Sequence, residues 1–318
     1  MAKATRLLFV ADLHGSAICF RKFINAAKVY NAQVLLVGGD IASKTVTPVF
    51  EGPPEWTATV EGESRRARSK EELAALEDWL RNSATVPLQT TRSEWAELIA
   101  NRPKADAVFE RQSLRELEHW LSWAKERLRG GTTRLLLGLG NDDFTSMEDV
   151  IARDDVAELT DNTVVRLDEH HEILTLQYSN RTPWATPREL TEEAIATKLD
   201  EGQRQLEHPD RAIFNLHVPP HGTNLDLAPR LTHDLTKVMA PGGDPDLVHV
   251  GSTAVRAAID RYQPLLGLHG HIHESRGYAR LGRSICLNPG SAYGEGTLLG
   301  VVVDLVADGI RSHLLTTG

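Results

Sequence analysis

The hydrophobic pattern of the first forty residues predicts a strand–helix–strand unit. Residues 5–11, TRLLFVA, form a short apolar run that ends at Asp12. In residues 16–31, apolar positions recur every three or four residues, as expected for one face of a helix. Residues 33–40, QVLLVGGD, form a second apolar run that ends at two glycines and Asp40. Two buried strands joined by a helix are typical of a βαβ unit in a parallel sheet.

A different pattern follows between about residues 50 and 130, where charged residues and tryptophans are frequent. We interpret this region as a helical insert. One of its helices repeats apolar residues at steps of three and four, which predicts a seam against another helix. The members of this seam are Leu114, Leu117, Leu121, Ala124 and Leu128.

Two interpretations of the tryptophans in the insert stay open. They pack as core residues, or one or two of them overhang a site as a lid. The residues concerned are Trp56, Trp79, Trp95, Trp120 and Trp123.

The strand pattern resumes after the insert and continues to the end of the chain. Strands are predicted at 133–143, 163–167, 172–178, 212–217, 265–270 and 284–288, with a terminal hairpin of 298–305 and 309–315. Helices are predicted at about 188–206 and 252–262. The fold class is therefore mixed α/β (α+β), and we expect a single domain over residues 1–318 that includes the insert.

Composition and charge narrow the classes of function. The chain has 35 Lys+Arg and 44 Asp+Glu, a net charge of −9, and no basic block, which argues against a nuclease with an extended nucleic-acid surface. A small phosphorylated substrate is still compatible, because bound cations reverse the local sign of charge. We expect no membrane span and no signal peptide, since the apolar runs are too short. Cys19 and Cys286 make no disulfide framework, so a cytoplasmic location is expected.

Side chains that can bind metals follow five of the apolar strands. They are Asp12 with His14, Asp40, Asn141, His217, and His271 with His273. Loops beyond the carboxyl ends of strands in an open α/β sheet converge on one crevice, so we expect these side chains to meet. If the strand predicted at 265–270 continued through GLHGHIHES (267–275), His269, His271 and His273 would share one face of it.

The mixture of imidazole, carboxylate and amide ligands indicates the kind of metal. Nitrogen and oxygen ligands together suit Mn, Fe, Zn, Co or Ni better than Mg or Ca, which prefer all-oxygen shells. Seven ligands are too many for one first-row ion. They suit two divalent ions that share a bridging carboxylate, as in two-metal phosphoester sites.

These motifs, in this order, resemble those of the calcineurin-like metallophosphoesterase superfamily. The matching stretches are DLHG (12–15), GGD (38–40), GND (140–142), LH (216–217) and GHIH (270–273). The longer stretches of sequence around these motifs, together with LNPGSAYGEG (287–296), look most like the Icc-related predicted phosphoesterase branch. The resemblance covers nearly the whole chain outside the insert. It implies two mixed β-sheets packed face to face and flanked by helices, with a dinuclear metal site at one end.

The resemblance also implies a role for each ligand. Asp12, His14, Asp40 and His273 would hold one ion. Asp40, Asn141, His217 and His271 would hold the other, with Asp40 as the bridge. The implied activity is a phosphoesterase that hydrolyses a small phosphodiester or phosphoanhydride through a metal-bridging hydroxide, with Mn as the first metal expected. His269 is interpreted as a support for the ligands.

Asp142 is the position where the sequence departs from the superfamily, which carries a histidine there as general acid for the leaving oxygen. A carboxyl beside two dications should stay ionised and donate a proton poorly. Three consequences stay open. The substrates have acidic leaving groups, another group such as His221 supplies the proton, or hydrolysis is lost and the fold is a metal-binding scaffold for protein partners. A phosphomonoesterase with the same site is a further alternative.

Several neighbouring residues have two interpretations each. Asp143 orients the missing histidine, or it is a turn or capping carboxylate. The loop 217–226, HVPPHGTNLD, contacts substrate through His221, Asn224 and Asp226, or it supplies only turn chemistry. Arg21 and Lys44 reach a phosphate or are ordinary surface charges.

Overall fold

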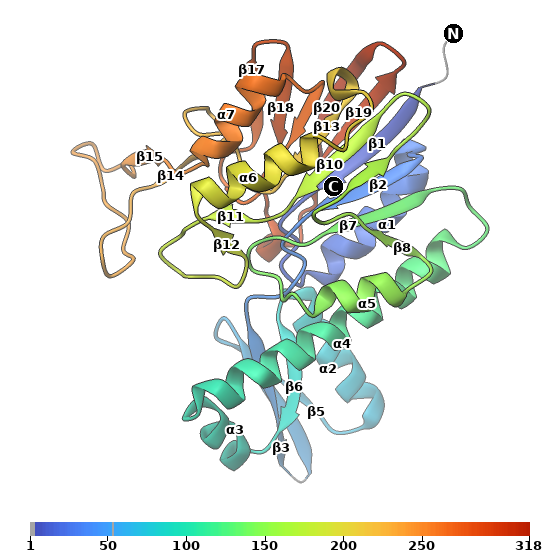
Figure 1. Ribbon diagram of the computed structural model, residues 1–318. Coiled ribbons are helices and arrows are strands. Elements are labelled where there is room, and N and C mark those ends of the chain that lie inside the picture. Colours follow the sequence, from blue (N-terminus) through green and yellow to red (C-terminus); the bar gives the residue numbers. More distant parts are fainter. Residues whose placement is uncertain (1–3, 53) are drawn as a thin grey trace.

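Two six-stranded mixed sheets form the body of the computed structural model, which describes residues 4–52 and 54–318. The sheets pack face to face as a sandwich (Figure 1). This arrangement confirms the fold class predicted from the sequence.

The first sheet has the strand order β20-β19-β1-β2-β7-β8. Its strands are β1 Thr5–Val10, β2 Val34–Gly38, β7 Arg134–Gly138, β8 Ala157–Leu159, β19 Leu299–Val306 and β20 Gly309–Thr317. β1, β2, β7 and β8 run parallel. β19 lies antiparallel to β1, and the terminal hairpin is completed by β20.

The second sheet has the order β17-β18-β16-β13-β10-β9. Its strands are β9 Val164–Arg166, β10 Glu172–Leu176, β13 Ile213–Leu216, β16 Leu266–Leu268, β17 Gly277–Leu281 and β18 Ser284–Asn288. The four central strands are parallel, and the two edge strands are antiparallel to their neighbours. The predicted strands are therefore present, although several are shorter than expected.

The central strands are apolar on both faces because both faces are covered. In β1, Leu7 and Phe9 face the second sheet, where they meet Ile213 and Leu266. The alternate residues Leu8 and Val10 pack against helices on the outer face. A continuous apolar run without alternation is what such a doubly covered strand requires.

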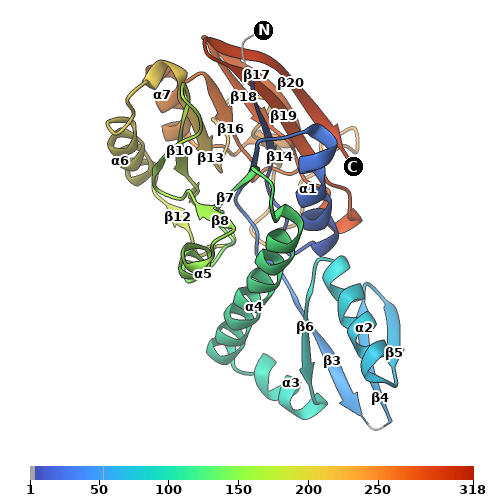
Figure 2. The same cartoon turned by 90° about the vertical axis from the view of Figure 1, so that its right-hand side faces the viewer.

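Helices cover the outer face of each sheet (Figure 2). α1 Ala17–Tyr30, α4 Arg102–Leu128 and α5 Met147–Arg153 pack on the first sheet. α6 Glu192–Gln203 and α7 Thr253–Tyr262 pack on the second. β14 Leu227–Pro229 and β15 Leu247–His249 pair at the base of a protruding hairpin, and β11 Ser179–Asn180 pairs with β12 Glu189–Leu190 (Figure 1). None of the helices in the described ranges is long and apolar enough to cross a membrane.

The prediction of an all-helical insert is wrong for its first part. Four strands within residues 46–52, 55–67 and 86–90 form a sheet in the order β5-β4-β3-β6. Its strands are β3 Val46–Gly52, β4 Glu55–Val60, β5 Glu63–Ala67 and β6 Val86–Thr90. EWTATV in β4 is rich in β-branched residues, which favour strands, but the high content of charge around it conceals this signal. The helical part of the insert consists of α2 Lys70–Asn82, α3 Arg92–Ile99 and α4.

The predicted seam on α4 exists, and its partner is α1 of the sandwich. Leu117, Leu121 and Ala124 are buried in the outer core with residues of α1. Trp120 stacks on Phe20, with ring centroids 4.4 Å apart. The tryptophans at 56, 79, 120 and 123 pack into cores, as the first interpretation expected.

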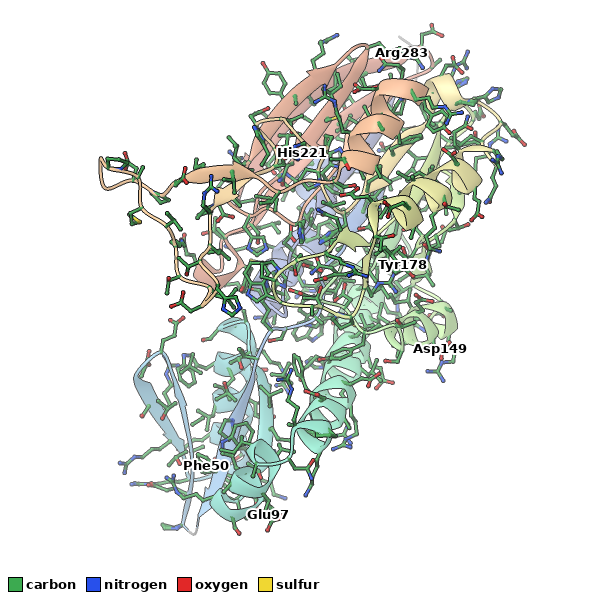
Figure 3. The ribbon with its side chains drawn as sticks, turned by 60° about the vertical axis from the view of Figure 1, so that its left-hand side comes forward. Phe50, Glu97, Asp149, Tyr178, His221 and Arg283 are labelled. Atoms are coloured by element: carbon green, nitrogen blue, oxygen red, sulfur yellow. The ribbon has the colours of Figure 1, made fainter. Side chains whose placement is uncertain are left out.

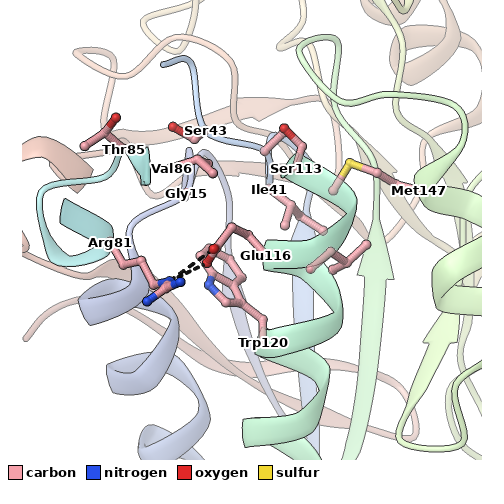
Figure 4. A pocket seen from close by; sticks show the side chains of 12 residues that line it. Gly15, Ile41, Ser43, Arg81, Thr85, Val86, Ser113, Glu116, Trp120 and Met147 are labelled. Carbon is pink, nitrogen blue, oxygen red and sulfur yellow. Dashed lines mark hydrogen bonds and ion pairs between the residues drawn. The ribbon is translucent and has the colours of Figure 1, made fainter. Parts of the chain in front are cut away.

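The insert also contacts the loops that follow β1 and β2 (Figure 4). Arg81 of α2 donates to both carboxylate oxygens of Glu116 in α4, at 3.1 and 3.0 Å. Beside this pair, a cavity of about 10 Å³ is lined by Gly15 and Ser43, among others, and has room for about one water molecule. The insert therefore packs closely against the chain segments just after His14 and Asp40.

We expect Trp120→Ala to lower the free energy of unfolding by about 3–5 kcal/mol, because it removes a buried ring and leaves a cavity between α1 and α4. Urea denaturation followed by circular dichroism measures this change. Trp95→Ala, a partly buried tryptophan of α3, is the matched control and should cost less than about 1.5 kcal/mol. Equal losses in the two variants would contradict the role of Trp120 in docking the insert.

Candidate metal centre

Seven polar side chains that follow strands of both sheets converge at one end of the sandwich. Their places are Asp12 and His14 after β1, Asp40 after β2, Asn141 after β7, His217 after β13, and His271 and His273 after β16. The strands are parallel within each sheet, so their carboxyl ends lie at a common edge. Three groups of acidic and imidazole side chains are close enough to hold a metal ion: Asp12–His14–His273, Asp40–His217–His271 and His14–Asp40–Asp142.

The first group brings two imidazoles and a carboxylate together. His14 Nε2 lies 3.0 Å from His273 Nε2, and His273 Nε2 lies 3.5 Å from Asp12 Oδ1. Two ligands bound to one ion at about 2.1 Å and at right angles are about 3.0 Å apart. The spacing of the two ring nitrogens fits a shared cation, and it is also the length of a hydrogen bond between the two rings.

The second group has the same character. His217 Nε2 lies 3.4 Å from Asp40 Oδ2 and 3.0 Å from Asn141 Oδ1. The rings of His217 and His271 meet edge to face, with centroids 5.3 Å apart. His271 and His273 thus belong to different groups, although they are two residues apart in the sequence.

Asp40 joins the two groups. Its Oδ2 lies 3.5 Å from His14 Nε2 and 3.4 Å from His217 Nε2. The other oxygen, Oδ1, accepts a hydrogen bond from the backbone N–H of Asp142 at 3.0 Å. This bond fixes the carboxylate between one imidazole from each sheet.

The charges at the centre are arranged as if around a cation. Burial would raise the pKa of Asp40, but the charge and hydrogen bond of His217 hold it well below its usual range. Burial would lower the pKa of His217, but the charge and hydrogen bond of Asp40, with the charge of Asp12, raise it to about 10. His217 Nδ1 donates to Gly38 O at 2.8 Å, so the second proton lies on Nε2, facing Asp40 and Asn141. That proton occupies the place where a cation would join the three side chains.

Two of the other imidazoles, those of His14 and His271, are ready to act as ligands. Burial lowers the pKa of His14 to about 3 and that of His271 to about 4, against the opposing charges of nearby carboxylates. Both rings are therefore neutral at pH 7 and keep free lone pairs, which metal binding requires. Burial would lower the pKa of His273, but the hydrogen bond and charge of Asp12 raise it.

The amide of Asn141 is oriented by its neighbours. Its Nδ2 donates to Thr186 Oγ1 at 2.9 Å and to Asp142 Oδ1 at 3.0 Å. Thr186 Oγ1 in turn donates to Glu189 Oε1 at 2.8 Å. The amide oxygen of Asn141 is left to face His217. Sequence reasoning missed Thr186, which lies in a loop without any motif.

The strand does not continue through residues 267–275, so His269, His271 and His273 do not share one face of it. β16 ends at Leu268, and His271 has a φ of 66°. His269 is buried and donates from Nδ1 to Leu216 O at 2.8 Å, next to His217. It belongs to neither imidazole–carboxylate group, and this contact supports the strand end, as expected for a residue behind the ligands.

Four of the seven ligand candidates have left-handed backbone. Asp12, His14, Asp40 and His271 have φ values of 57°, 41°, 55° and 66°. Asp and His are among the non-glycine residues that tolerate this region best, yet it still costs free energy that the surrounding structure must supply. In each case the chain turns sharply at a strand end and directs a side chain inward.

Two glycines let the strand ends approach each other. A side chain on Gly140 would overlap Oδ1 and the backbone nitrogen of Asp40. A side chain on Gly270 would lie 2.6 Å from Asp12 Oδ2. Both motif glycines are therefore required by close packing against a carboxylate of the centre.

Asp143 ties two of the strand ends together. It is fully buried and accepts hydrogen bonds from the backbone N–H groups of Ile41, Ala42 and Gly140, at 3.0, 2.6 and 2.7 Å. Burial and the charge of Asp40 raise the pKa of Asp143 to about 7, against these hydrogen bonds. Of its two interpretations, the turn carboxylate describes its contacts.

Asp142, which replaces the expected histidine, pairs with Lys44. The distance from Lys44 Nζ to Asp142 Oδ2 is 3.1 Å, and the same oxygen lies 3.8 Å from His14 Nδ1. Burial and the charge of Asp40 raise the pKa of Asp142, while Lys44 opposes them. Tyr293, which carried no signal in the sequence, packs its ring on His14 and His273 with centroids 4.7 and 5.8 Å apart.

His221 belongs to a different cluster. It lies in the loop after β13 (Figure 3), where its Nδ1 is 3.6 Å from Asp226 Oδ2 and its ring meets that of His249. Asp226 also accepts backbone N–H groups of Gly222, Thr223 and Gly251, so the loop shows the turn chemistry of the second interpretation. Among the described residues, no hydrogen bond or ion pair joins His221 to the seven ligand candidates, and its role as proton donor stays a prediction.

Arg21 points away from the centre. It lies over the ring of Trp123 and donates to Asn82, both in the insert. Cys19 and Cys286 are buried free thiols, in keeping with the absence of a disulfide framework in the sequence.

Comparison with known proteins establishes similarity in fold. No protein-family model matches the chain. The uncharacterized protein MJ1162 of Methanocaldococcus jannaschii is 36% identical over 114 residues, which are 35% of this chain and 44% of that protein. The match thus spans less than half the length of this curated relative.

Two solved structures align over nearly the entire chain. One covers 99% of both chains with a TM-score of 0.60 and 15% identity. TT1561 of Thermus thermophilus also covers 99% of both, with a TM-score of 0.55 and 13% identity. What they share with this chain is the fold. The sandwich of two mixed sheets flanked by helices that the motifs implied is present.

The donor set fits divalent metal ions. Buried carboxylates are costly without a compensating cation, and Asp12 and Asp40 are 1% and 2% exposed. Imidazole nitrogens, an oriented amide oxygen and a carboxylate between the two groups are the complementary ligands. Asp12, His14, Asp40 and His273 could hold one ion, and Asp40, Asn141, His217 and His271 a second.

We expect Gly140→Ala to weaken Mn²⁺ binding about 10–100-fold while the protein stays folded, because the new methyl group displaces the Asp40 carboxylate. Isothermal titration of metal-stripped protein measures the affinity, and circular dichroism checks the fold. Gly242→Ala is the control, since a side chain there meets open space. Unchanged Mn²⁺ affinity in Gly140→Ala would show that Asp40 does not need its observed position.

Proposed function

We propose that the protein is a dimetal-dependent phosphoesterase that hydrolyses a small phosphodiester or phosphoanhydride. The observation that carries the proposal is the position of Asp40, whose Oδ2 lies 3.5 and 3.4 Å from imidazole nitrogens of two separate groups. A carboxylate placed between two ligand groups is the arrangement that a pair of ions with a shared ligand needs.

The chemistry of such a site divides between ions and protein. Two divalent ions would supply an acidified water as nucleophile and neutralise charge on the phosphoryl oxygens. The chain holds its ligands in fixed positions through Gly38, Thr186 and Asp143, so that little reorganisation is needed during the reaction.

The proposal extends to the metal and to the branch of the superfamily. Imidazole nitrogen in both groups favours first-row ions, and we propose Mn²⁺ as the first to test, ahead of Fe²⁺, Co²⁺, Ni²⁺ and Zn²⁺. The sequences of the motifs, from DLHG at residue 12 to LNPGSAYGEG at residue 287, support the Icc-related branch.

The position of Asp142 favours phosphodiesters and phosphoanhydrides over alkyl phosphomonoesters as substrates. Burial and the charge of Asp40 raise the pKa of Asp142, but Lys44 at 3.1 Å opposes them and two bound cations would lower it further, so we expect a poor proton donor. A substrate whose leaving group departs without a proton suits such a site better than one with a basic alkoxide.

We expect metal-stripped protein to be inactive toward bis-p-nitrophenyl phosphate and to gain activity with Mn²⁺. Asp40→Asn should lose at least about 10³-fold in kcat/KM, because both ligand groups lose their shared charge. Release of p-nitrophenolate is followed spectrophotometrically, with stripped and reloaded protein compared at equal metal concentration.

Asp106→Asn, an exposed carboxylate in α4, is the matched control and should keep wild-type activity. If folded wild-type protein stays inactive with every first-row ion tested, the hydrolase proposal fails and a metal-binding scaffold takes its place. A preference for p-nitrophenyl phosphate over the diester would assign a phosphomonoesterase.

A further inference from the structure

Lys44 places a permanent positive charge at the edge of the centre. Its ammonium is 3.1 Å from Asp142 Oδ2, and that carboxylate is grouped with His14 and Asp40. The side chain of Lys44 is 44% exposed, so the ammonium stays open to a ligand from solvent. One of its three N–H donors serves Asp142, which leaves others for an anion.

The backbone on both sides of Lys44 is held by the insert. Ser43 Oγ donates to Ala84 O at 2.8 Å, and the backbone N–H of Val86 donates to Thr45 O at 3.0 Å. Asp143 binds the N–H groups of Ile41 and Ala42 just before this segment. A lysine on such a fixed segment, with its ammonium held by a carboxylate, is positioned as a ligand-binding group rather than as a mobile surface charge.

We propose that Lys44, positioned by Asp142, binds the oxygen of the leaving group, and that the preferred substrates are phosphoanhydrides and diesters whose leaving group departs as an anion. This inference rests on the proposed hydrolase function. It gives the Asp142–Lys44 pair the task of stabilising negative charge, in a position where proton donation would otherwise be expected.

The step balances without a proton donor in the protein. The oxygen of the attacking water, after losing a proton to solvent, forms a bond to phosphorus as the bond from phosphorus to the leaving oxygen breaks. The electron pair of the broken bond goes to the leaving oxygen, which departs as an anion beside Lys44. Lys44 keeps its three protons, and the product is protonated later by solvent according to its own pKa.

Leaving-group dependence tests this role. A series of aryl methyl phosphates with phenols of decreasing acidity is hydrolysed by Mn²⁺-loaded wild type, Lys44→Met and Lys44→Arg. We expect Lys44→Met to lose roughly 10²-fold in kcat/KM, with the loss growing as the phenol becomes less acidic. Lys44→Arg retains the charge and should keep the wild-type slope. Asp142→Asn should steepen the slope in the same direction, because it frees the ammonium from its position.

Lys104→Met, an exposed lysine of α4, is the control for removal of a positive charge. An equal loss for every phenol would place Lys44 on an oxygen that does not leave, and it would overturn the proposal. An unchanged kcat/KM would overturn it as well. Mn²⁺ content and thermal unfolding of each variant identify a loss that is only structural, which also counts against the proposal.

Binding of inorganic phosphate separates this inference from the hydrolase proposal. Calorimetric titration of Mn²⁺-loaded wild type and Lys44→Met with orthophosphate needs no turnover. If wild type does not hydrolyse any ester but Lys44→Met binds phosphate about tenfold more weakly, the hydrolase proposal fails while Lys44 keeps its anion-binding role. If phosphate binding is equal in both proteins, the role of Lys44 is refuted whatever the activity of the wild type.

Discussion

The burial of Asp40 between the two sheets is the constraint on which the centre depends. This carboxylate is 2% exposed and lies between an imidazole that follows β1 and an imidazole that follows β13. A charge in such a place is tolerated only with compensation, and among the described residues the charge and hydrogen bond of His217, with the charges of His14 and Lys44, favour the ionised form of Asp40. The sandwich therefore closes around a cluster of negative charge, in which Asp12, Asp142 and Asp143 lie near Asp40 and imidazoles and Lys44 supply the opposing charge.

Local backbone geometry shows how the fold reaches this arrangement. Four residues of the centre adopt left-handed conformations, which cost about 1 kcal/mol or more each. Glycines at 140 and 270 remove the side chains that would keep the strand ends apart. Asp143 then ties the segments after β2 and β7 with three backbone hydrogen bonds. Four of the seven ligand candidates carry this strain, and the packed sheets and helices around the centre support it.

The sequence predicts the parts of this structure that follow from periodicity and from strand ends. Apolar runs identify the central strands because both of their faces are buried, and the polar residues after those runs identify the ligand candidates. The sheet of the insert escapes such reasoning because its charged outer face resembles a helix surface. The turn at His271 depends on a contact with Asp12, far away in the sequence. Tyr293 meets His14, and Lys44 meets Asp142, across similar gaps. The spacing of motifs in a single sequence does not show which loops lie side by side in the fold.

The point in the chain at which the insert begins links the position of the insert to that of Lys44. It begins at Val46, six residues after Asp40, so the segment that carries Lys44 connects the centre directly to β3. β6 and the loop before it bind both neighbours of Lys44, and α4 fixes the insert to α1 through Trp120. A displacement of the insert would therefore move Lys44 before it moved any of the seven ligand candidates. In the role that we propose for Lys44, the insert would influence which substrates bind through this backbone connection. A tryptophan lid over the centre would instead act by covering the site.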